Sequence, residues 1–396
     1  MAEHSAKNSM VEFLRQLVAI PSQAGSDDPA AIVQAVGTWL AENGGHFQRL
    51  GTARNPRALV INPPTQASDE VLLLNACLDT APVGDLAQWQ YPPFGAIEHE
   101  GWLHGRGSAD SKAAVAILSE IARAMPLTAR ESHDGRLRRV TLVFDCDEHS
   151  GRFGGIKAYT AKFGFPAFCA IGYPGPRHIV VGSRGFYRTV LTLRGEMGHS
   201  GSGSVPAELA VAKLQRLLTG LEKVREQGIP ASENFALRPR ASVTWLRTGA
   251  RTYALTPAKI ECGLDIRLTP GFGHEAAGRF LDELLADIAR EIGGIHASSL
   301  GPVNCWPAYR TPDDALLPRL LQSCAQETLG HAPEFSVSGP SNIGNYLAMH
   351  GTQVVSGFGV EYQRIHGPDE CVKLDSIPGL HAAYALAVQR FLDGHA

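Results

Sequence analysis

The chain has 396 residues, of which 44% are hydrophobic and 19% are charged, and its formal net charge is −3. These values are ordinary for a soluble globular protein, and a charge so close to neutral gives no reason to expect a nucleic-acid or membrane-surface partner. The length exceeds the size at which a single core keeps growing, so we expect two domains.

The first eight residues are polar and do not resemble a signal peptide. No apolar run in the sequence approaches the roughly 20 residues that a bilayer-spanning helix needs. The seven cysteines are odd in number and have no paired spacing, which suits a reducing compartment better than a disulfide framework. We therefore expect a cytoplasmic protein with no membrane partner.

The first part of the chain alternates predicted helices and strands. Apolar residues at helical spacing predict helices over 10–18, 30–40 and 111–125, and short apolar runs predict strands at 58–61, 71–74 and 139–143. This alternation predicts an α/β core with a mostly parallel sheet flanked by helices.

The character of the chain changes near residue 183. The middle section predicts strands over 185–193, 241–246 and 259–268 and helices over 207–224 and 275–292. After about residue 300 the α/β character returns, with a helix over 315–329, a strand at 354–355 and a helix over 376–392. We therefore expect one α/β domain in two parts, 1–182 and 299–396, with an α+β domain inserted at 183–298.

Chemically active side chains cluster where predicted strands end. The stretch Phe144–Gly151 follows an apolar run and presents acids and an imidazole before a glycine. Active groups of parallel sheets gather at the carboxyl ends of strands. The candidates placed there are Cys77, Asp79, Asp110, Glu148 and His149.

A series of motifs follows in an order that is typical of one family. The matching segments are Leu73–Asp85, Leu103–Lys112, Asp147–Gly151, Gly172–Pro174, Gly195–Ser200, Ala258–Arg267 and Ile365–Glu370. Over nearly its whole length the chain thus resembles the acetylornithine deacetylase, succinyl-diaminopimelate desuccinylase and aminoacylase family of co-catalytic metallopeptidases. The resemblance implies a metallopeptidase catalytic domain, an inserted lid and dimerisation domain, a homodimer, and hydrolysis of an N-acyl amino acid or a small peptide-like amide.

The resemblance also implies a set of metal ligands, several of which differ in this chain. In the family two divalent metals share a bridging aspartate, which corresponds to Asp110. One metal would be held by Asp110, His149 and His366, and the other by Asp110, Cys77 and Tyr173. The family has histidine in place of Cys77 and glutamate in place of His149 and Tyr173, so two of the five ligands are unchanged.

These exchanges favour one ion rather than two. A thiolate is a good zinc ligand, but a phenol with a pKa near ~10 is a poor one. Two dications ~3.5 Å apart repel each other by roughly 19 kcal/mol at an effective dielectric of ~20, and the exchanges remove two of the carboxylates that would offset this repulsion. Two imidazoles and a carboxylate suit a single catalytic Zn²⁺, with Mn²⁺, Co²⁺ or Fe²⁺ as alternatives.

The other roles are carried over from the family position by position. Glu148 corresponds to the general base, and Asp79 to the acid that orients an imidazole, which Cys77 no longer provides. His199 corresponds to the lid histidine that stabilises the oxyanion. Arg267 corresponds to a lid residue that holds a substrate carboxylate. The proposed substrate contacts are Arg267, Tyr173 and Asn342, the last in the glycine-rich segment 338–345.

Each candidate also has a simpler interpretation. Cys77 can be a small apolar filler, His149 a solvated turn residue, His366 a loop residue, and Arg267 one side of a structural ion pair; Tyr173 is more easily a packing or substrate-facing aromatic than a ligand. Three functions therefore stay open: a one-metal amidohydrolase, a non-hydrolytic protein that binds a small amide or carboxylate, and an enzyme that uses Cys77 as nucleophile.

Overall fold

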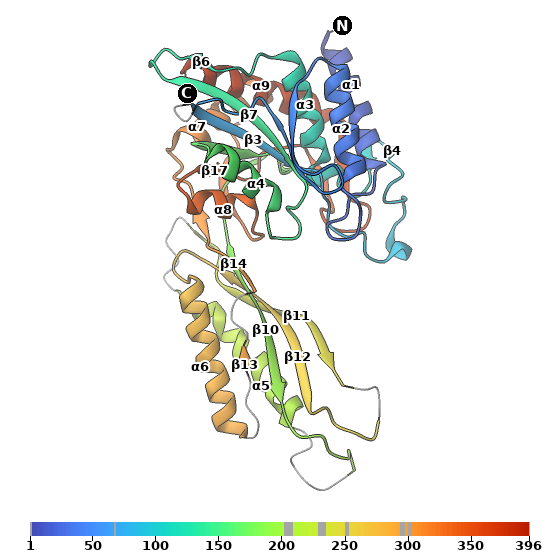
Figure 1. Cartoon of the computed structure of the whole chain (residues 1–396), viewed down its shortest axis with the longest axis vertical. Coiled ribbons are helices and arrows are strands. Elements are labelled where there is room, and N and C mark those ends of the chain that lie inside the picture. The colour runs from blue at the N-terminus through green and yellow to red at the C-terminus, as the bar shows by residue number, and fades with distance from the viewer. Residues whose placement is uncertain are drawn as a thin grey trace. The chain divides into compact units, whose positions relative to one another are not determined.

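The computed structural model, drawn in Figure 1, describes residues 2–66, 69–201, 209–228, 235–249, 253–293, 298–299 and 303–395. The chain divides into two compact units. The first comprises Met1–Gly182, Arg310–Ser336 and Asn342–Ala396, and the second comprises Ser183–Tyr309 and Val337–Ser341. The second unit extends past the expected boundary at 298 because the strand Asn304–Trp306 still pairs within its sheet.

The first unit contains, among the described residues, a seven-stranded sheet in the order β1-β2-β7-β3-β8-β17, with β6 added to β7. The strands are β1 (Phe47–Gly51), β2 (Pro56–Ile61), β3 (Glu70–Cys77), β6 (Arg130–Glu131), β7 (Leu137–Asp145), β8 (Phe168–Ile171) and β17 (Gln353–Val355). β7, β3, β8 and β17 run parallel, whereas β1, β2 and β6 pair antiparallel. The α/β class is confirmed, and the antiparallel strands make the sheet mixed.

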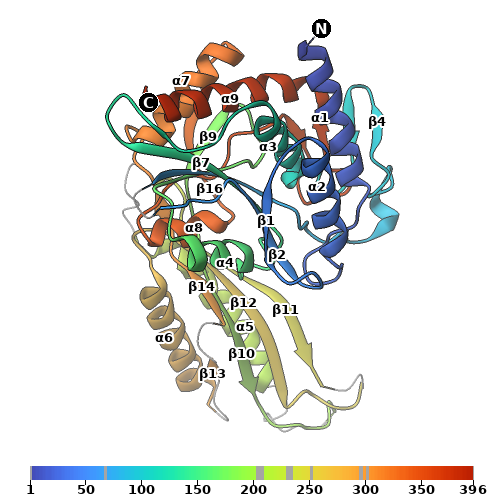
Figure 2. The same ribbon diagram turned by 45° about the horizontal axis from the view of Figure 1, so that its top comes forward.

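Helices pack against this sheet, most of them through one apolar core. They are α1 (Ala2–Val18), α2 (Ala30–Glu42), α3 (Ala113–Ala124), α4 (Gly154–Phe163), α7 (Leu316–Leu329), α8 (Ile343–Met349) and α9 (Ile377–Asp393). Phe13 of α1, Leu74 of β3, Val115 of α3 and Phe391 of α9 are all buried in that core, and Figure 2 shows α7 alongside α9. None of the helices in the described ranges combines the length and apolar character that crossing a bilayer requires.

Two smaller sheets complete the strand pairing around this core. One has the order β15-β9-β16 and the other the order β18-β19-β5-β4. Their strands are β4 (Ile97–His99), β5 (Trp102–His104), β9 (His178–Ser183), β15 (Tyr309–Arg310), β16 (Glu334–Ser338), β18 (Tyr362–Gln363) and β19 (Cys371–Lys373). The pairing of His104 with Cys371 joins segments that are far apart in the sequence. Short helical turns lie at Leu86–Gln88, Ser108–Lys112, Glu222–Glu226 and Leu374–Ser376.

The second unit has its own sheet and its own core. Its sheet has the order β11-β12-β10-β13, with β14 also paired to β10. The strands are β10 (Gly185–Arg194), β11 (Arg240–Thr248), β12 (Lys259–Leu268), β13 (Ser298–Ser299) and β14 (Asn304–Trp306), and the helices are α5 (Leu209–Leu221) and α6 (His274–Ile292). Both helices run along this sheet (Figure 2) and bury leucines against it. The expected helix start at 207 lies outside the described residues.

Candidate metal centre

Strand register brings the candidate side chains of the first unit to one edge of the sheet. Cys77 is the last residue of β3 and lies directly beside Asp145, the last residue of β7. The segments that follow these two strands therefore leave the sheet next to each other. Asp110 lies, with non-helical backbone angles, in the segment Ser108–Lys112 that leads into α3, and His366 lies between β18 and β19 with a left-handed φ of 60°.

Asp110 lies at the centre of this cluster. Its Oδ2 is 2.8 Å from His366 Nε2 and 3.5 Å from His149 Nε2. The three residues offer ligand atoms that all lie within 4.8 Å of one another. Asp110 and His149 are largely buried, whereas the His366 side chain is 49% exposed. The structure thus brings together the two imidazoles and the carboxylate that the sequence proposes for one ion.

Asp79 contacts the segment that carries His149 and Glu148. Its carboxylate accepts the backbone N–H of Glu148 at 3.1 Å and that of His149 at 2.8 Å. Its Oδ2 also lies 3.3 Å from His149 Nδ1. The interpretation that Asp79 has no imidazole left to orient is therefore wrong: the imidazole absent at position 77 is present at position 149, within reach of the same acid.

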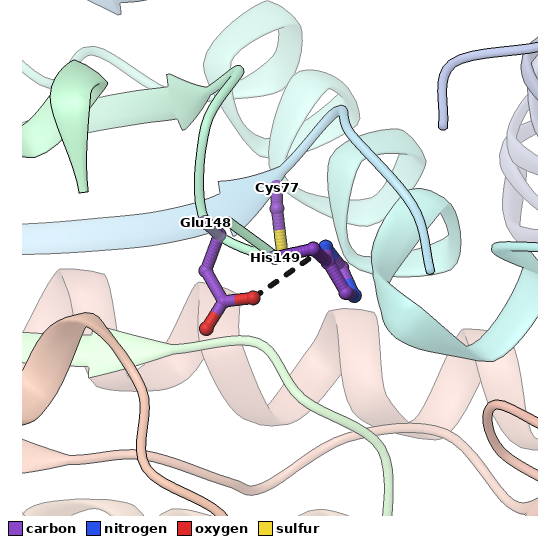
Figure 3. Close-up of side chains that lie close together, drawn as sticks. All are labelled: Cys77, Glu148 and His149. Carbon is purple, nitrogen blue, oxygen red and sulfur yellow. Dashed lines mark ion pairs between the residues drawn. The ribbon is translucent and has the colours of Figure 1, made fainter. Parts of the chain in front are cut away.

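Cys77 and Tyr173 lie on the other side of Asp110. The Cys77 Sγ is buried and lies 3.2 Å from Ser111 Oγ, 3.8 Å from Asp110 Oδ1 and 4.0 Å from the Tyr173 hydroxyl. The Tyr173 hydroxyl forms a side-chain hydrogen bond with Glu148. Cys77, Glu148 and His149 form a second set of potential ligand atoms within 4.8 Å, and Figure 3 shows the imidazole facing the Glu148 carboxylate, 3.4 Å away.

Burial and neighbouring charges shift the pKa values of the cluster. Burial raises the pKa of Glu148 to about 7, with further contributions from the charges of Asp110 and Asp79, while the charge of His149 opposes the rise. Burial also raises the pKa of the Cys77 thiol and of the Tyr173 phenol. For Asp110 burial acts in the same direction, but the neighbouring His149 and His366 outweigh it and hold the pKa of this carboxyl below its usual range.

The donor set fits a divalent cation. His149 Nε2 is buried and, among the described residues, has no hydrogen-bond partner, although it faces Asp110 Oδ2. A cation between these two atoms and His366 Nε2 would give His149 Nε2 a partner and could be bound by all three atoms. Two imidazoles and one carboxylate with open positions form the usual protein contribution to a catalytic zinc site.

Two candidates belong to the second unit. His199 is exposed, and its Nδ1 accepts the backbone N–H of Gly201 at 3.1 Å. A neutral His199 therefore carries its proton on Nε2, which makes Nε2 a donor. Arg267 makes an ion pair with Asp265 at 2.8 Å and donates to Ser341 Oγ at 3.3 Å. The simpler interpretation of Arg267 as part of an ion pair is thus realised, and its role toward a substrate stays a prediction.

Asn342 has a structural partner within the first unit. Its side-chain oxygen accepts the backbone N–H of Gly344 at 2.8 Å, and its own N–H donates to the side chain of Asn345. This capping box starts α8. The cap occupies the Asn342 oxygen, so a substrate contact would fall to the side-chain nitrogen.

The sequence reasoning passed over three polar residues that contact the cluster. Ser111 contacts Cys77: its Oγ accepts the Cys77 backbone N–H at 2.8 Å and lies 3.2 Å from Sγ. Arg106 and Glu370 form a buried ion pair beside Asp110 and His366. In the sequence, Arg106 stands close to Asp110 and Glu370 stands close to His366. Only the fold shows that these two opposite charges contact each other.

Comparison with known proteins gives a consistent assignment. The model of peptidase family M20/M25/M40 matches residues 73–390. Succinyl-diaminopimelate desuccinylase 2 of Shewanella loihica is 26% identical over 97% of this chain and 100% of its own length. A succinyl-diaminopimelate desuccinylase of Cereibacter sphaeroides is 30% identical over 78% of this chain and 80% of its own length.

Solved structures share the fold. Human carnosine dipeptidase 1 superposes with a TM-score of 0.77 at 14% identity, covering 99% of this chain and 97% of that protein. A dinuclear metal-binding peptidase from Bacillus subtilis gives a TM-score of 0.66 at 15% identity, covering 98% and 99%. At these identities the likeness concerns the fold alone, whereas the family match favours hydrolysis over the non-hydrolytic alternative.

Proposed function

We propose, on the premise that this chain belongs to peptidase family M20/M25/M40, that it hydrolyses an N-acylated amino acid with a single divalent cation. As a family member it is a metal-dependent amide hydrolase. The single observation that carries the finer proposal is the meeting of Asp110, His149 and His366 at one point, with Cys77 and Tyr173 in place of the remaining family ligands.

Zn²⁺ is the ion that this donor set favours. Asp110, His149 and His366 would hold it, and a cation bound there would polarise the scissile carbonyl and lower the pKa of water. Cys77 remains a candidate ligand, but burial raises the pKa of its thiol, which favours the neutral form. Because His149 and Tyr173 replace two of the family's carboxylates, the two positions together have less negative charge to balance another dication.

Glu148 is the proposed general base. It lies beside the ligand His149, and a carboxyl with a pKa near neutrality can both accept and return a proton at physiological pH. Its oxygen would take a proton from the attacking water and deliver it to the leaving amine. Asp79 would hold the segment of Glu148 and His149 in place through the two backbone N–H groups.

The substrate class follows from the relatives and from the second unit. The relatives named above are desuccinylases, so an N-succinyl amino acid is the first substrate to test, followed by N-acetyl amino acids and dipeptides. His199 is proposed to donate to the oxyanion through Nε2, and Arg267 to bind a substrate carboxylate. Tyr173 and Asn342 are proposed as further substrate contacts. We also propose a cytoplasmic homodimer that forms through the second unit, the inserted lid.

Metal analysis and one substitution test this proposal. Protein prepared with excess zinc and then desalted should hold one equivalent. Glu148→Gln should keep that equivalent and lower kcat by about 10²- to 10⁴-fold, because the amide cannot accept the proton. The matched control is Asp147→Asn, which changes the neighbouring acid that bonds to Gly154 and pairs with Arg57, and it should retain turnover. Two equivalents of zinc, or an active Glu148→Gln, would contradict the proposal.

A further inference from the structure

The buried ion pair between Arg106 and Glu370 joins the two segments that carry Asp110 and His366. The guanidinium Nη1 lies 2.5 Å from Glu370 Oε2, and the side chains are 1% and 0% exposed. A buried ion pair seldom stabilises a fold more than apolar side chains of the same size, because removing both charges from water is costly. Its presence here therefore needs a reason other than stability.

Glu370 fixes the backbone of Asp110. Its Oε1 accepts the N–H of Ala109 at 2.9 Å and the N–H of Asp110 at 3.1 Å, while Oε2 is engaged by Arg106. Both oxygens of the Glu370 carboxylate thus bond to the short segment from Arg106 to Asp110. Because the Asp110 N–H is fixed, its Cα and the direction of its side chain are constrained as well.

Arg106 fixes the backbone of His366. Its second terminal nitrogen, Nη2, donates to the His366 carbonyl at 3.0 Å. His366 has a left-handed φ of 60°, a conformation that is unfavourable for a non-glycine residue and persists only where neighbours impose it. The guanidinium can reach Glu370 and this carbonyl at once because its nitrogens form a rigid fork.

The surroundings of the pair join the same two segments. The backbone N–H of Gly105 donates to the Glu370 carbonyl at 2.8 Å, directly beyond the β5–β19 pairing. The Trp89 ring lies 5.2 Å from the Arg106 guanidinium, which helps to exclude water from the pair. The β5–β19 pairing aligns the segment that carries Asp110 with the segment that carries His366. Beyond the last paired residues, the ion pair holds the two segments together next to the proposed ligands.

We infer that Arg106 and Glu370 are positioning residues: they set the distance between Asp110 and His366, and through it the affinity of the metal site. This inference rests on the proposed ligand set. It assigns the pair no contact with the cation or the substrate, so its effect is on the geometry of the ligands and hence on metal binding before any turnover.

Two variants separate this role from ordinary core stability. Arg106→Lys keeps the positive charge but loses the fork, so it cannot bond to Glu370 and the His366 carbonyl together. Glu370→Gln keeps the shape and an acceptor for the backbone N–H groups but removes the charge. The matched control is Asp69→Asn: Asp69 is also a fully buried acid, pairs with Arg139 at 2.8 Å, and lies next to the opposite end of β3.

The measurement is the Zn²⁺ dissociation constant of each full-length protein by competition with a chromophoric chelator, together with the melting temperature of the metal-free form. Loss of a group that orients metal ligands typically weakens binding about 10- to 100-fold. We expect that loss for Arg106→Lys and Glu370→Gln, with a changed visible spectrum of the Co²⁺ form. Asp69→Asn should lower the melting temperature without changing the affinity.

The outcomes distinguish the inference from the proposed function. Unchanged Zn²⁺ affinity in both variants, with folded protein and a lower melting temperature, would reduce the pair to a structural role and overturn the inference. If the unsubstituted protein binds no Zn²⁺, the proposed function fails first. If one of the two variants does not fold, the other still tests the inference, because weaker Zn²⁺ binding is expected for each of them separately.

Discussion

At the scale of single residues, Tyr173 is the exchange that bears most directly on the proposal of a single ion. Its hydroxyl lies 4.0 Å from Cys77 Sγ and hydrogen-bonds to Glu148, so a neutral donor stands where the family has a carboxylate. Burial raises the pKa of this phenol, which keeps it protonated at neutral pH. The charge that would balance a second dication is therefore absent at this position.

Restoring the family ligands should convert the site from one ion to two. In the variant Cys77→His/His149→Glu/Tyr173→Glu the second position regains an imidazole and a carboxylate, and the first position regains a carboxylate. The two restored carboxylates offset the repulsion between two dications. Metal analysis after zinc loading and desalting should rise from one equivalent to two. Tyr173→Phe, which adds no charge, is the control and should remain at one. A folded triple variant that still binds one ion would mean that the three exchanges do not set the stoichiometry.

Cys77 should be dispensable for bond cleavage. Nucleophilic cysteines act as thiolates, and burial beside three acids raises the pKa of this thiol. We expect Cys77→Ser to bind one equivalent of metal and to keep kcat/KM within about tenfold, because the hydroxyl can still bond to Ser111. Cys169→Ser, at a buried thiol within β8, controls for the cost of a buried hydroxyl. Complete loss of activity in Cys77→Ser alone would instead support the nucleophile hypothesis.

At the scale of elements, the close packing of α3 against the end of β8 sets where Asp110 lies. Gly172 follows β8 directly, and its N–H donates to the Asn75 carbonyl of β3 at 2.9 Å. A Cβ added at Gly172 would come within 2.5 Å of the Ala114 Cβ in the first turn of α3. Glycine at 172 is therefore needed for this helix to approach the sheet.

Substitution of Gly172 should destabilise the protein, and a second substitution at Ala114 should partly restore the lost stability. Gly172→Ala should lower the free energy of unfolding by about 1–3 kcal/mol through overpacking. Ala114→Gly removes the clashing methyl at a cost of about 1 kcal/mol for a helical glycine. Denaturant unfolding of the double variant should therefore show less destabilisation than the sum of the two single changes. Strict additivity would mean that the two positions do not touch.

The sequence alone was sufficient to predict the ends of the strands but not the contacts made by the loops that follow them. The ends of β3 and β7 were predictable, because apolar runs mark buried strands and the groups that follow them share an edge in a parallel sheet. The partner of Asp79 was not predictable from sequence, because it depends on how the turn after β7 folds back to place the His149 N–H and Nδ1 on one carboxylate. The Arg106–Glu370 pair likewise joins residues separated by 264 positions.

At the scale of the whole molecule, the proposed ligands all belong to one of the two units. Asp110, His149, His366 and Cys77 lie in the first unit, which has its own core. The second unit has a separate core built on β10, β12, α5 and α6. Because the two cores are separate, we expect metal binding to raise the stability of the first unit. The proposed substrate contacts His199 and Arg267 belong to the second unit.

Removing the metal from the full chain should therefore affect the two units unequally. A ligand present at a thousand times its dissociation constant stabilises the state that binds it by about 4 kcal/mol. After chelation, hydrogen exchange measured by mass spectrometry should accelerate in the first unit, above all in α3 and β19, which flank Asp110 and His366. Exchange in β10 and β12 should stay the same, and added Zn²⁺ should reverse the change. Equal acceleration in β10 and β12 would show that metal binding stabilises both units alike and would contradict this prediction.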